Sequence, residues 1–271
     1  MPPLVVDVSS PLEWLIRRDR LVVGFGLAVL TALAWAYLAK MAGGMHSAAM
    51  QAEMHAAMGM PEMGAWGVAE IGALFLMWAM MMIGMMVPSA APVMLLVLGV
   101  YRRRSGGRAR TSATLFMTGY LLAWIAFSAV AAAGQVLLHQ AALLSPQMAT
   151  RSALLAGLIL VTAGVYQWLP IKNACLTHCR SPLDFLTRQW REGVTGALSM
   201  GLWHGLFCVG CCWALMALLF VIGVMNLMWV AVITAFVLVE KLTSQGPRLG
   251  RVAGALLVIW GTYLLTRSVG G

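Results

Sequence analysis

One uncharged apolar stretch, residues 200–216, carries soft metal-ligating side chains at helical spacing. These side chains are His204, Cys208, Cys211, Cys212 and Met216. Their intervals of three and four residues predict one face of a single helix, because a helix has 3.6 residues per turn. An imidazole, thiols and a thioether suit Cu(I) as a cofactor, with zinc possible if the thiols ionise. Cysteine and methionine also fill helix interfaces, but an imidazole inside a membrane is costly and therefore indicates a functional site.

A second group of soft residues lies in the Met/His-rich segment 41–63, which holds seven of the 21 methionines. Its alanine-rich middle favours a helix, and its aligned side chains are His46, Met50, Met54 and Met58. Two interpretations remain open. The segment is an amphipathic helix lying on the membrane with its methionines in lipid, or it is a thioether trap for Cu(I).

A third group lies in the apolar run 66–100, where Met77, Met81 and Met85 share a helix face. Taken singly, these methionines are core residues, but a row of them next to a Met/His-rich segment also predicts ligands. Pro88 and Pro92 remove backbone donors and predict a kink or break. Ser89 lies between them and is expected to bond one of the freed carbonyls.

The fourth group is Cys175-Leu-Thr-His-Cys179, in which two thiols and His178 form a potential metal clip on a turn of helix. The alternative is a pair of reduced cysteines without a role. All five cysteines fall within residues 175–212, a distribution that does not match a secreted disulfide framework.

Composition shows which elements must position these groups. The chain is 61% hydrophobic and only 10% charged, whereas soluble domains carry about 25% charged residues. We therefore expect an all-α, polytopic transmembrane helix bundle, since a crossing needs about 20 apolar residues. The expected spans, about seven, are 21–40, 66–100, 113–138, 152–169, 193–223, 227–239 and 252–265. Glu240 and Lys241 follow the sixth span as an ion pair or an exit group for metal or protons.

The charge pattern predicts the orientation of the bundle. With the N-terminus cytoplasmic, 15 of the 18 basic residues fall in cytoplasmic segments, including Lys172 and Lys241. This asymmetry follows the positive-inside rule, so the net charge of +9 does not indicate nucleic-acid binding. The expected parts are a cytoplasmic interfacial arm (1–20) and a single membrane domain (21–271) that includes a periplasmic Met/His-rich loop (41–64). No cleavable signal peptide is expected.

Three motifs resemble one bacterial family. They are M-W-A-M-M-x-x-x-M-M-x-P-S-A-A-P in residues 77–92, P-x-K-x-x-C-x-x-x-C-R in 170–180, and G-x-x-C-x-G-C-C-W in 205–213. The sequence is similar to the predicted metal-binding integral membrane proteins, a family with a domain of unknown function. The resemblance covers residues 66–245 and implies an inner-membrane helical protein with a metal site, without an assigned reaction.

Two main functions fit these residues. The first is a protein of the bacterial inner membrane that takes up Cu(I) outside, passes it inward, or delivers it to a partner metalloprotein or metallochaperone. Its route would start in segment 41–63, continue along Met77, Met81 and Met85, and end at the cysteines. No phosphate-binding loop of the ATPase kind appears. The second is a membrane thiol oxidoreductase that uses Cys208 and Cys211 as a C-x-x-C pair. An accessory subunit of a larger membrane complex is a third alternative.

Overall fold

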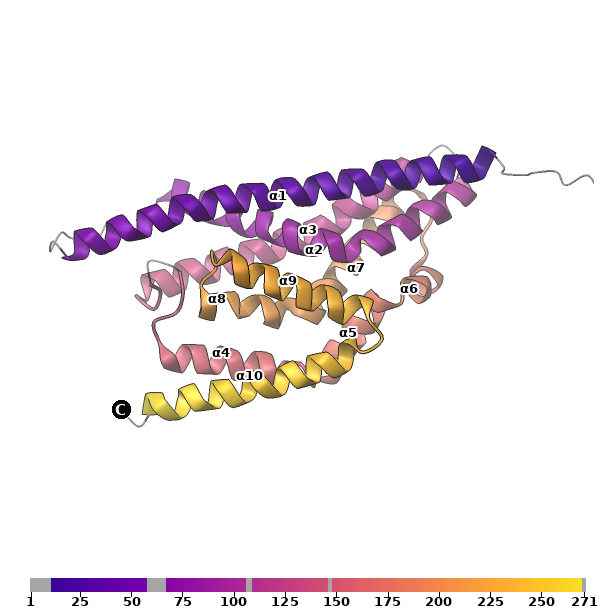
Figure 1. Ribbon diagram of the computed structural model, residues 1–271. Helices are drawn as coiled ribbons and strands as arrows, with labels where there is room; N and C mark the ends of the chain where they lie inside the picture. Colours follow the sequence, from indigo (N-terminus) through magenta and orange to yellow (C-terminus); the bar gives the residue numbers. More distant parts are fainter. Residues whose placement is uncertain (1–10, 58–66, 106–108, 146–147, 270–271) are drawn as a thin grey trace, which may run out of the picture.

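The computed structural model describes residues 11–57, 67–105, 109–145 and 148–269, and within these ranges the chain is helical apart from short connections. The long helices run side by side along one direction (Figure 1). They are α1 (Pro11–Ala57), α2 (Val68–Ser105), α3 (Ala109–Gln140), α4 (Ala153–Tyr166), α5 (Pro170–Arg180), α6 (Pro182–Gln189), α7 (Gly193–Ala217), α8 (Leu219–Ile222), α9 (Leu227–Leu242) and α10 (Gly246–Val269). The expectation of an all-α bundle is confirmed.

Five helical stretches of the described chain are long and apolar enough to cross a membrane: Arg18–Gly44, Val68–Arg104, Ala109–Gln140, Gly193–Ile222 and Gly246–Ser268. A sixth is added if α4 and α5, which meet at a 64° bend, form one broken span. The remaining expected span is α9, which has 16 residues. These helices are consistent with a membrane protein, and a count of seven depends on the shorter α9.

The helix α2 continues through Pro88 and Pro92 without the predicted break. Pro88 has no N–H for the carbonyl of Gly84, and Trp35 of α1 donates its indole N–H to that oxygen at 3.2 Å instead. The expectation that Ser89 bonds a freed carbonyl is wrong. Its hydroxyl donates to the carbonyl of Met86 at 2.8 Å. A neighbouring helix therefore replaces the bond that proline removes, as membrane helices require.

Glycines let two helix pairs pack closely. A Cβ on Gly201 of α7 would lie 1.9 Å from the carbonyl oxygen of Phe116 on α3. A Cβ on Gly164 of α4 would lie 2.7 Å from the carbonyl oxygen of Gly254 on α10. Small residues at such contacts allow backbones to approach in membrane helix bundles. The α3–α7 contact fixes the helix that carries three of the cysteines.

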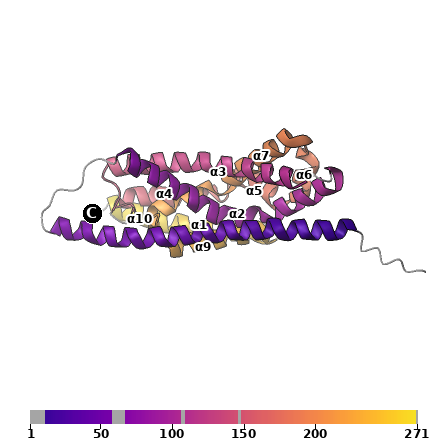
Figure 2. The same cartoon turned by 90° about the horizontal axis from the view of Figure 1, so that it is seen from above.

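The helix α1 lies along one side of the bundle and extends beyond it (Figure 2). It continues to Ala57, so positions 46, 50 and 54 belong to a helix instead of a loop. The expected helix in the alanine-rich part is confirmed up to that residue. The side chains of His46, Met50 and Met54 are not described, and Met58 lies outside the described residues.

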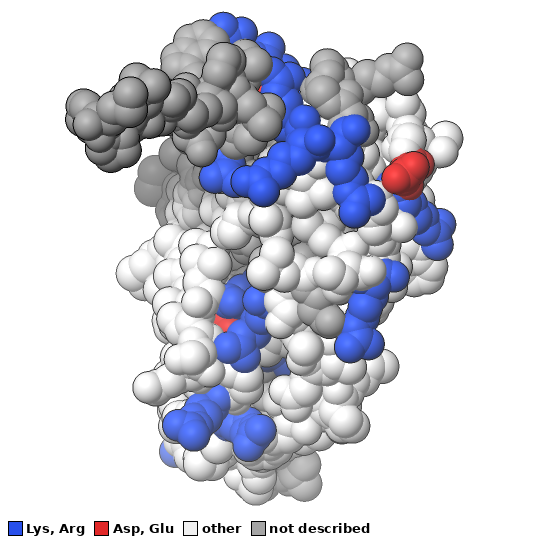
Figure 3. All heavy atoms as spheres, turned by 90° about the vertical axis from the view of Figure 1, so that its right-hand side faces the viewer, with Lys and Arg blue, Asp and Glu red and all other residues white. Residues whose placement is uncertain are grey.

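Exposed arginines gather on one end of the bundle (Figure 3). The exposed arginines at the helix ends of this region are Arg103 and Arg104 of α2, Arg110 of α3, Arg188 of α6 and Arg191 just before α7. Two of the basic residues expected in cytoplasmic segments, Lys172 and Lys241, are buried inside the bundle. The asymmetry of the exposed charges therefore remains, but these two lysines need another explanation.

Candidate metal centre

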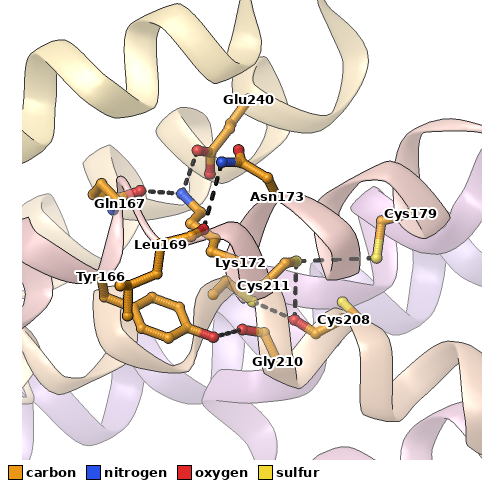
Figure 4. A network of polar contacts seen from close by, with 11 residues as sticks. Tyr166, Gln167, Leu169, Lys172, Asn173, Cys179, Cys208, Gly210, Cys211 and Glu240 are labelled. Carbon is orange, nitrogen blue, oxygen red and sulfur yellow. Dashed lines mark hydrogen bonds and ion pairs between the residues drawn. The ribbon is translucent and has the colours of Figure 1, made fainter.

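The cysteines of α5 and α7 meet at one place. The sulfurs of Cys179 and Cys211 lie 3.9 Å apart, and Figure 4 shows Cys179 pointing from α5 toward Cys211. The sulfur of Cys175 lies 2.9 Å from where a Cβ on Gly210 would be, so a glycine at that position lets α5 approach α7. All five cysteines are free thiols. The two cysteine groups that the sequence separates into a membrane site and an inner clip are neighbours.

The thiol of Cys208 has a polar environment deep in the bundle. Its sulfur lies 2.9 Å from the Nζ of Lys241 and 3.1 Å from the hydroxyl of Tyr120. The Lys241 ammonium also donates to the hydroxyl of Ser89 at 3.1 Å. All four side chains are buried. An ammonium next to a thiolate forms a charge-assisted hydrogen bond, which is stronger than a bond between neutral groups.

The thiols of Cys211 and Cys212 are oriented by the helix that carries them. They donate to the carbonyl of Cys208 at 3.1 Å and 2.8 Å. The carbonyl group thus holds both sulfurs near Cys208 on the buried side of α7. Met216, the last member of the predicted face, is fully buried one turn further along.

The imidazole of His204 is enclosed by aromatic rings. The ring centroids of Phe185, Tyr120 and Phe116 lie 5.0, 5.8 and 5.9 Å from it. Its Nδ1 is buried and has no hydrogen-bond partner among the described residues. A buried polar atom without a partner is unfavourable, so this nitrogen is available as a ligand.

The predicted clip of Cys175, Cys179 and His178 does not form as a unit. His178 stacks on Phe207 with ring centroids 4.1 Å apart and planes at 10°. Its Nδ1 lies 2.8 Å from the carbonyl oxygen of Ala174. The imidazole is therefore engaged within α5 and against α7, and the two thiols face the cysteines of α7 without it.

The predicted methionine face of α2 is buried, and the same helix reaches the cysteine site. Met77, Met81 and Met85 have at most 1% of their surface exposed. One turn after Met85, Ser89 contacts Lys241. The hydroxyl of Tyr120 lies within hydrogen-bond distance of both the carbonyl of Met86, at 3.1 Å, and the sulfur of Cys208. The structure thus connects the end of the methionine row to the thiols through polar side chains.

A buried ion pair lies beside the thiols. Lys172 of α5 pairs with Glu240 of α9 and also bonds the side-chain oxygen of Gln167 (Figure 4). The expectation that Glu240 and Lys241 pair with each other is wrong, because consecutive helix residues point in different directions. Glu240 binds α5, whereas Lys241 contacts α7 and α2.

Sequence reasoning missed the contacts of Tyr120 and Lys241 with Cys208. A lysine at the end of an apolar helix is a recognisable signal, because ionisable residues inside membranes usually have a functional partner. Its partner was misassigned because the sequence does not show that α9 ends beside α7. Tyr120 carries no such signal, since a tyrosine in an apolar helix is ordinary.

Two thiols of the described chain lie at a separation that suits two sulfur ligands of one metal ion. Among the described residues, no group of three or more His, Cys, Asp or Glu side chains is arranged to hold a metal ion. With metal–sulfur bonds of about 2.3 Å, trigonal coordination separates two sulfurs by about 4.0 Å. The 3.9 Å between Cys179 and Cys211 matches this separation. The arrangement therefore suits an ion that accepts few, soft ligands.

One protein family matches the sequence of this chain. A family model described as "PpoB2: Copper chaperone" matches residues 75–264. This range includes the five cysteines, Lys241 and the methionines of α2 from Met77 onward, and it excludes α1. No curated protein and no solved structure matches the chain.

Proposed function

We propose a function for this chain, which belongs to the PpoB2 copper chaperone family. It binds Cu(I) within a membrane and delivers the ion to a partner metalloprotein. The copper is cargo, held for transfer. The meeting of Cys179 with Cys211 carries the proposal, because two thiols from different helices stand at the separation of two sulfur ligands. Soft thiolate ligands favour Cu(I).

The ligands in this proposal are two thiols at a time from Cys179, Cys208 and Cys211, of which Cys179 and Cys211 lie 3.9 Å apart, with Cys175 and Cys212 next to them. His204 adds a nitrogen without a partner, one turn before Cys208. An incomplete cage fits a delivery role, because a partner's ligand needs an open position to take over the ion. The thiols bind as thiolates, so loading releases protons.

The route to this site would use the methionine row of α2. Thioethers bind Cu(I) without losing a proton, and Met85 lies one turn from Ser89, which contacts Lys241 beside Cys208. The Met/His-rich segment, whose positions 46, 50 and 54 belong to α1, would collect the ion first. We propose that the C-terminal part of α1, which lies at the end of the bundle opposite the arginine-rich end (Figures 1 and 3), faces the periplasmic side of a bacterial inner membrane.

The test is the copper content of the purified full chain after loading with Cu(I) under anaerobic, reducing conditions. The variant Cys179→Ser/Cys211→Ser is expected to lose most of the bound copper. Met225→Leu, which changes a buried methionine outside every predicted ligand set, should retain it. Equal copper in the double variant and in the wild type would contradict the proposal.

Thiol–disulfide exchange is the second candidate, because the same pair stands close enough to suggest it. The structure favours Cys179 with Cys211 for this chemistry over the C-x-x-C pair, since the thiol of Cys211 bonds the carbonyl of Cys208. Exchange requires an accessible thiolate, and Cys211 is buried. Trapping free thiols in cells distinguishes the candidates, because an oxidoreductase would show a Cys179–Cys211 disulfide whose level follows the redox conditions.

A further inference from the structure

Among the buried charged side chains of the described residues, Lys241 differs from the others in the groups that it contacts. The buried charged side chains of the described chain are Asp19, Lys172, Glu240 and Lys241. Asp19 forms ion pairs with Arg102 and Arg110 at the arginine-rich end of the bundle. The Lys172–Glu240 pair is neutral as a unit. Lys241 remains, and the side chains it contacts are a serine and the thiol of Cys208.

We infer that Lys241 makes the cysteine cluster selective for a monovalent metal ion, an inference that rests on the function proposed above. Two thiolates and Cu(I) carry a net charge of −1, and the ammonium of Lys241 brings the buried cluster to zero. Two thiolates and a divalent ion are already neutral, so the same ammonium leaves one uncompensated positive charge. Burying an uncompensated charge is strongly unfavourable.

The geometry lets Lys241 act on a bound ion without being a ligand. The Nζ lies 2.9 Å from the Cys208 sulfur, and a metal on that sulfur would lie about 2.3 Å from it. The ammonium and the metal are then about 5 Å apart at most. Ser89 holds the ammonium from the other side. A group that hydrogen-bonds to a metal-coordinating side chain orients that side chain and tunes the affinity of the site for the metal.

The size of the effect follows from Coulomb's law. At about 5 Å and an effective dielectric constant of about 20, the repulsion between the ammonium and one unit of metal charge lowers the metal affinity on the order of 100-fold. An ion with a second unit of charge is weakened by this factor once more. Lys241 therefore opposes a divalent ion more than a monovalent one by about this factor. Its removal should shift the preference toward divalent ions regardless of how many thiolates bind.

The experiment compares the affinities for Cu(I) and Cd(II) of the purified, reduced full chain, measured by competition with chelators. Lys241→Met should lower the ratio of Cu(I) to Cd(II) affinity on the order of 100-fold. Lys241→Gln, which retains a hydrogen-bond donor without the charge, should do the same. Lys241→Arg retains the charge and should keep the ratio within a few-fold of wild type. Lys40→Met removes an exposed lysine and serves as the charge-matched control.

Three results would overturn the inference. If wild type binds Cu(I) and both neutral variants keep its Cu(I)-to-Cd(II) ratio, Lys241 does not set selectivity, although the copper-binding function stands. If Lys241→Arg shifts the ratio as far as Lys241→Met, the effect comes from shape and not from charge. A wild-type chain that binds no Cu(I) contradicts the proposed function as well, so the two failures are distinguishable.

Discussion

At the scale of single residues, the environment of Cys208 differs from that of an ordinary buried thiol. Its sulfur has an ammonium and a phenol within 3.1 Å, whereas a structural cysteine usually packs among apolar groups. Buried polar networks are stable only when each member is bonded. Tyr120 contributes here by contacting the sulfur and the carbonyl of Met86 together.

Replacing Tyr120 with phenylalanine tests this contribution. The change removes both contacts of the hydroxyl and should cost about 1 kcal/mol of unfolding free energy, together with a weaker affinity for Cu(I). Denaturant unfolding in detergent and chelator competition measure the two effects. Tyr263→Phe on the exposed face of α10 is the matched control. An unchanged Cu(I) affinity in Tyr120→Phe would show that the contact with Cys208 has no influence on the site.

His204 gives a second prediction, with opposite effects on stability and on binding. The isolated Nδ1 costs free energy while the site is empty. His204→Phe removes that atom and fits an aromatic surrounding, so the metal-free protein should become more stable by about 1 kcal/mol. The same variant should bind Cu(I) more weakly. A variant that gains stability and keeps full copper affinity would show His204 to be a core residue.

At the scale of helices, the sequence predicts where the apolar helices lie, and five helices of the described chain are long and apolar enough to cross a membrane. Hydropathy and charge identify the long helices, because a span must be apolar over its whole length. The segment around Cys175 and Cys179 is expected between two spans, in a cytoplasmic part that contains Lys172 and Arg180. It forms α5, since Lys172 finds Glu240 inside the bundle. A partner that is 68 residues away in sequence leaves no local signal.

The contact between α3 and α7 yields a prediction about packing. Gly201→Ala would place a methyl group 1.9 Å from the backbone oxygen of Phe116, so the two helices must separate. We expect a loss of about 2 kcal/mol or more of unfolding free energy, as for other overpacked contacts. Gly134→Ala on α3 meets no atom within 4 Å and should stabilise the helix by about 0.5–1 kcal/mol. Similar unfolding curves for the two variants would contradict this close contact.

The ion pair between α5 and α9 gives a prediction for an element that carries two cysteines. Glu240→Gln leaves the Lys172 ammonium buried without its counter-charge, which costs about 3–5 kcal/mol. Adding Lys172→Met removes that charge and should recover a large part of the loss. Unfolding free energies of the two single variants and the double variant form the cycle that measures this coupling. Additive losses would mean that the pair does not act as a unit.

At the scale of the whole molecule, the arrangement of the helices bears on the count of crossings. The helix α1 begins at the end of the bundle that carries the exposed arginines, and α10 ends at the opposite end (Figures 1 and 3). An odd number of passes connects opposite ends. The five long helices and the bent α4–α5 pair give at most six candidate crossings, so seven would require the 16-residue α9 as well. The C-terminal end of α9 lies within the bundle, where Glu240 and Lys241 have buried partners.

A reporter experiment tests this topology in cells. Cytoplasmic and periplasmic reporters are fused before Pro11 and after Val269, and further reporters are inserted in the connections at 106–108 and 146–147. The positive-inside rule predicts the arginine-rich segment 102–110, which includes the connection 106–108, in the cytoplasm together with the start of α1. The connection 146–147 and the end of α10 should lie on the other side. If the reporters at the two ends of the described chain are active on the same side, the number of crossings is even, and α9 or the α4–α5 pair does not cross the membrane.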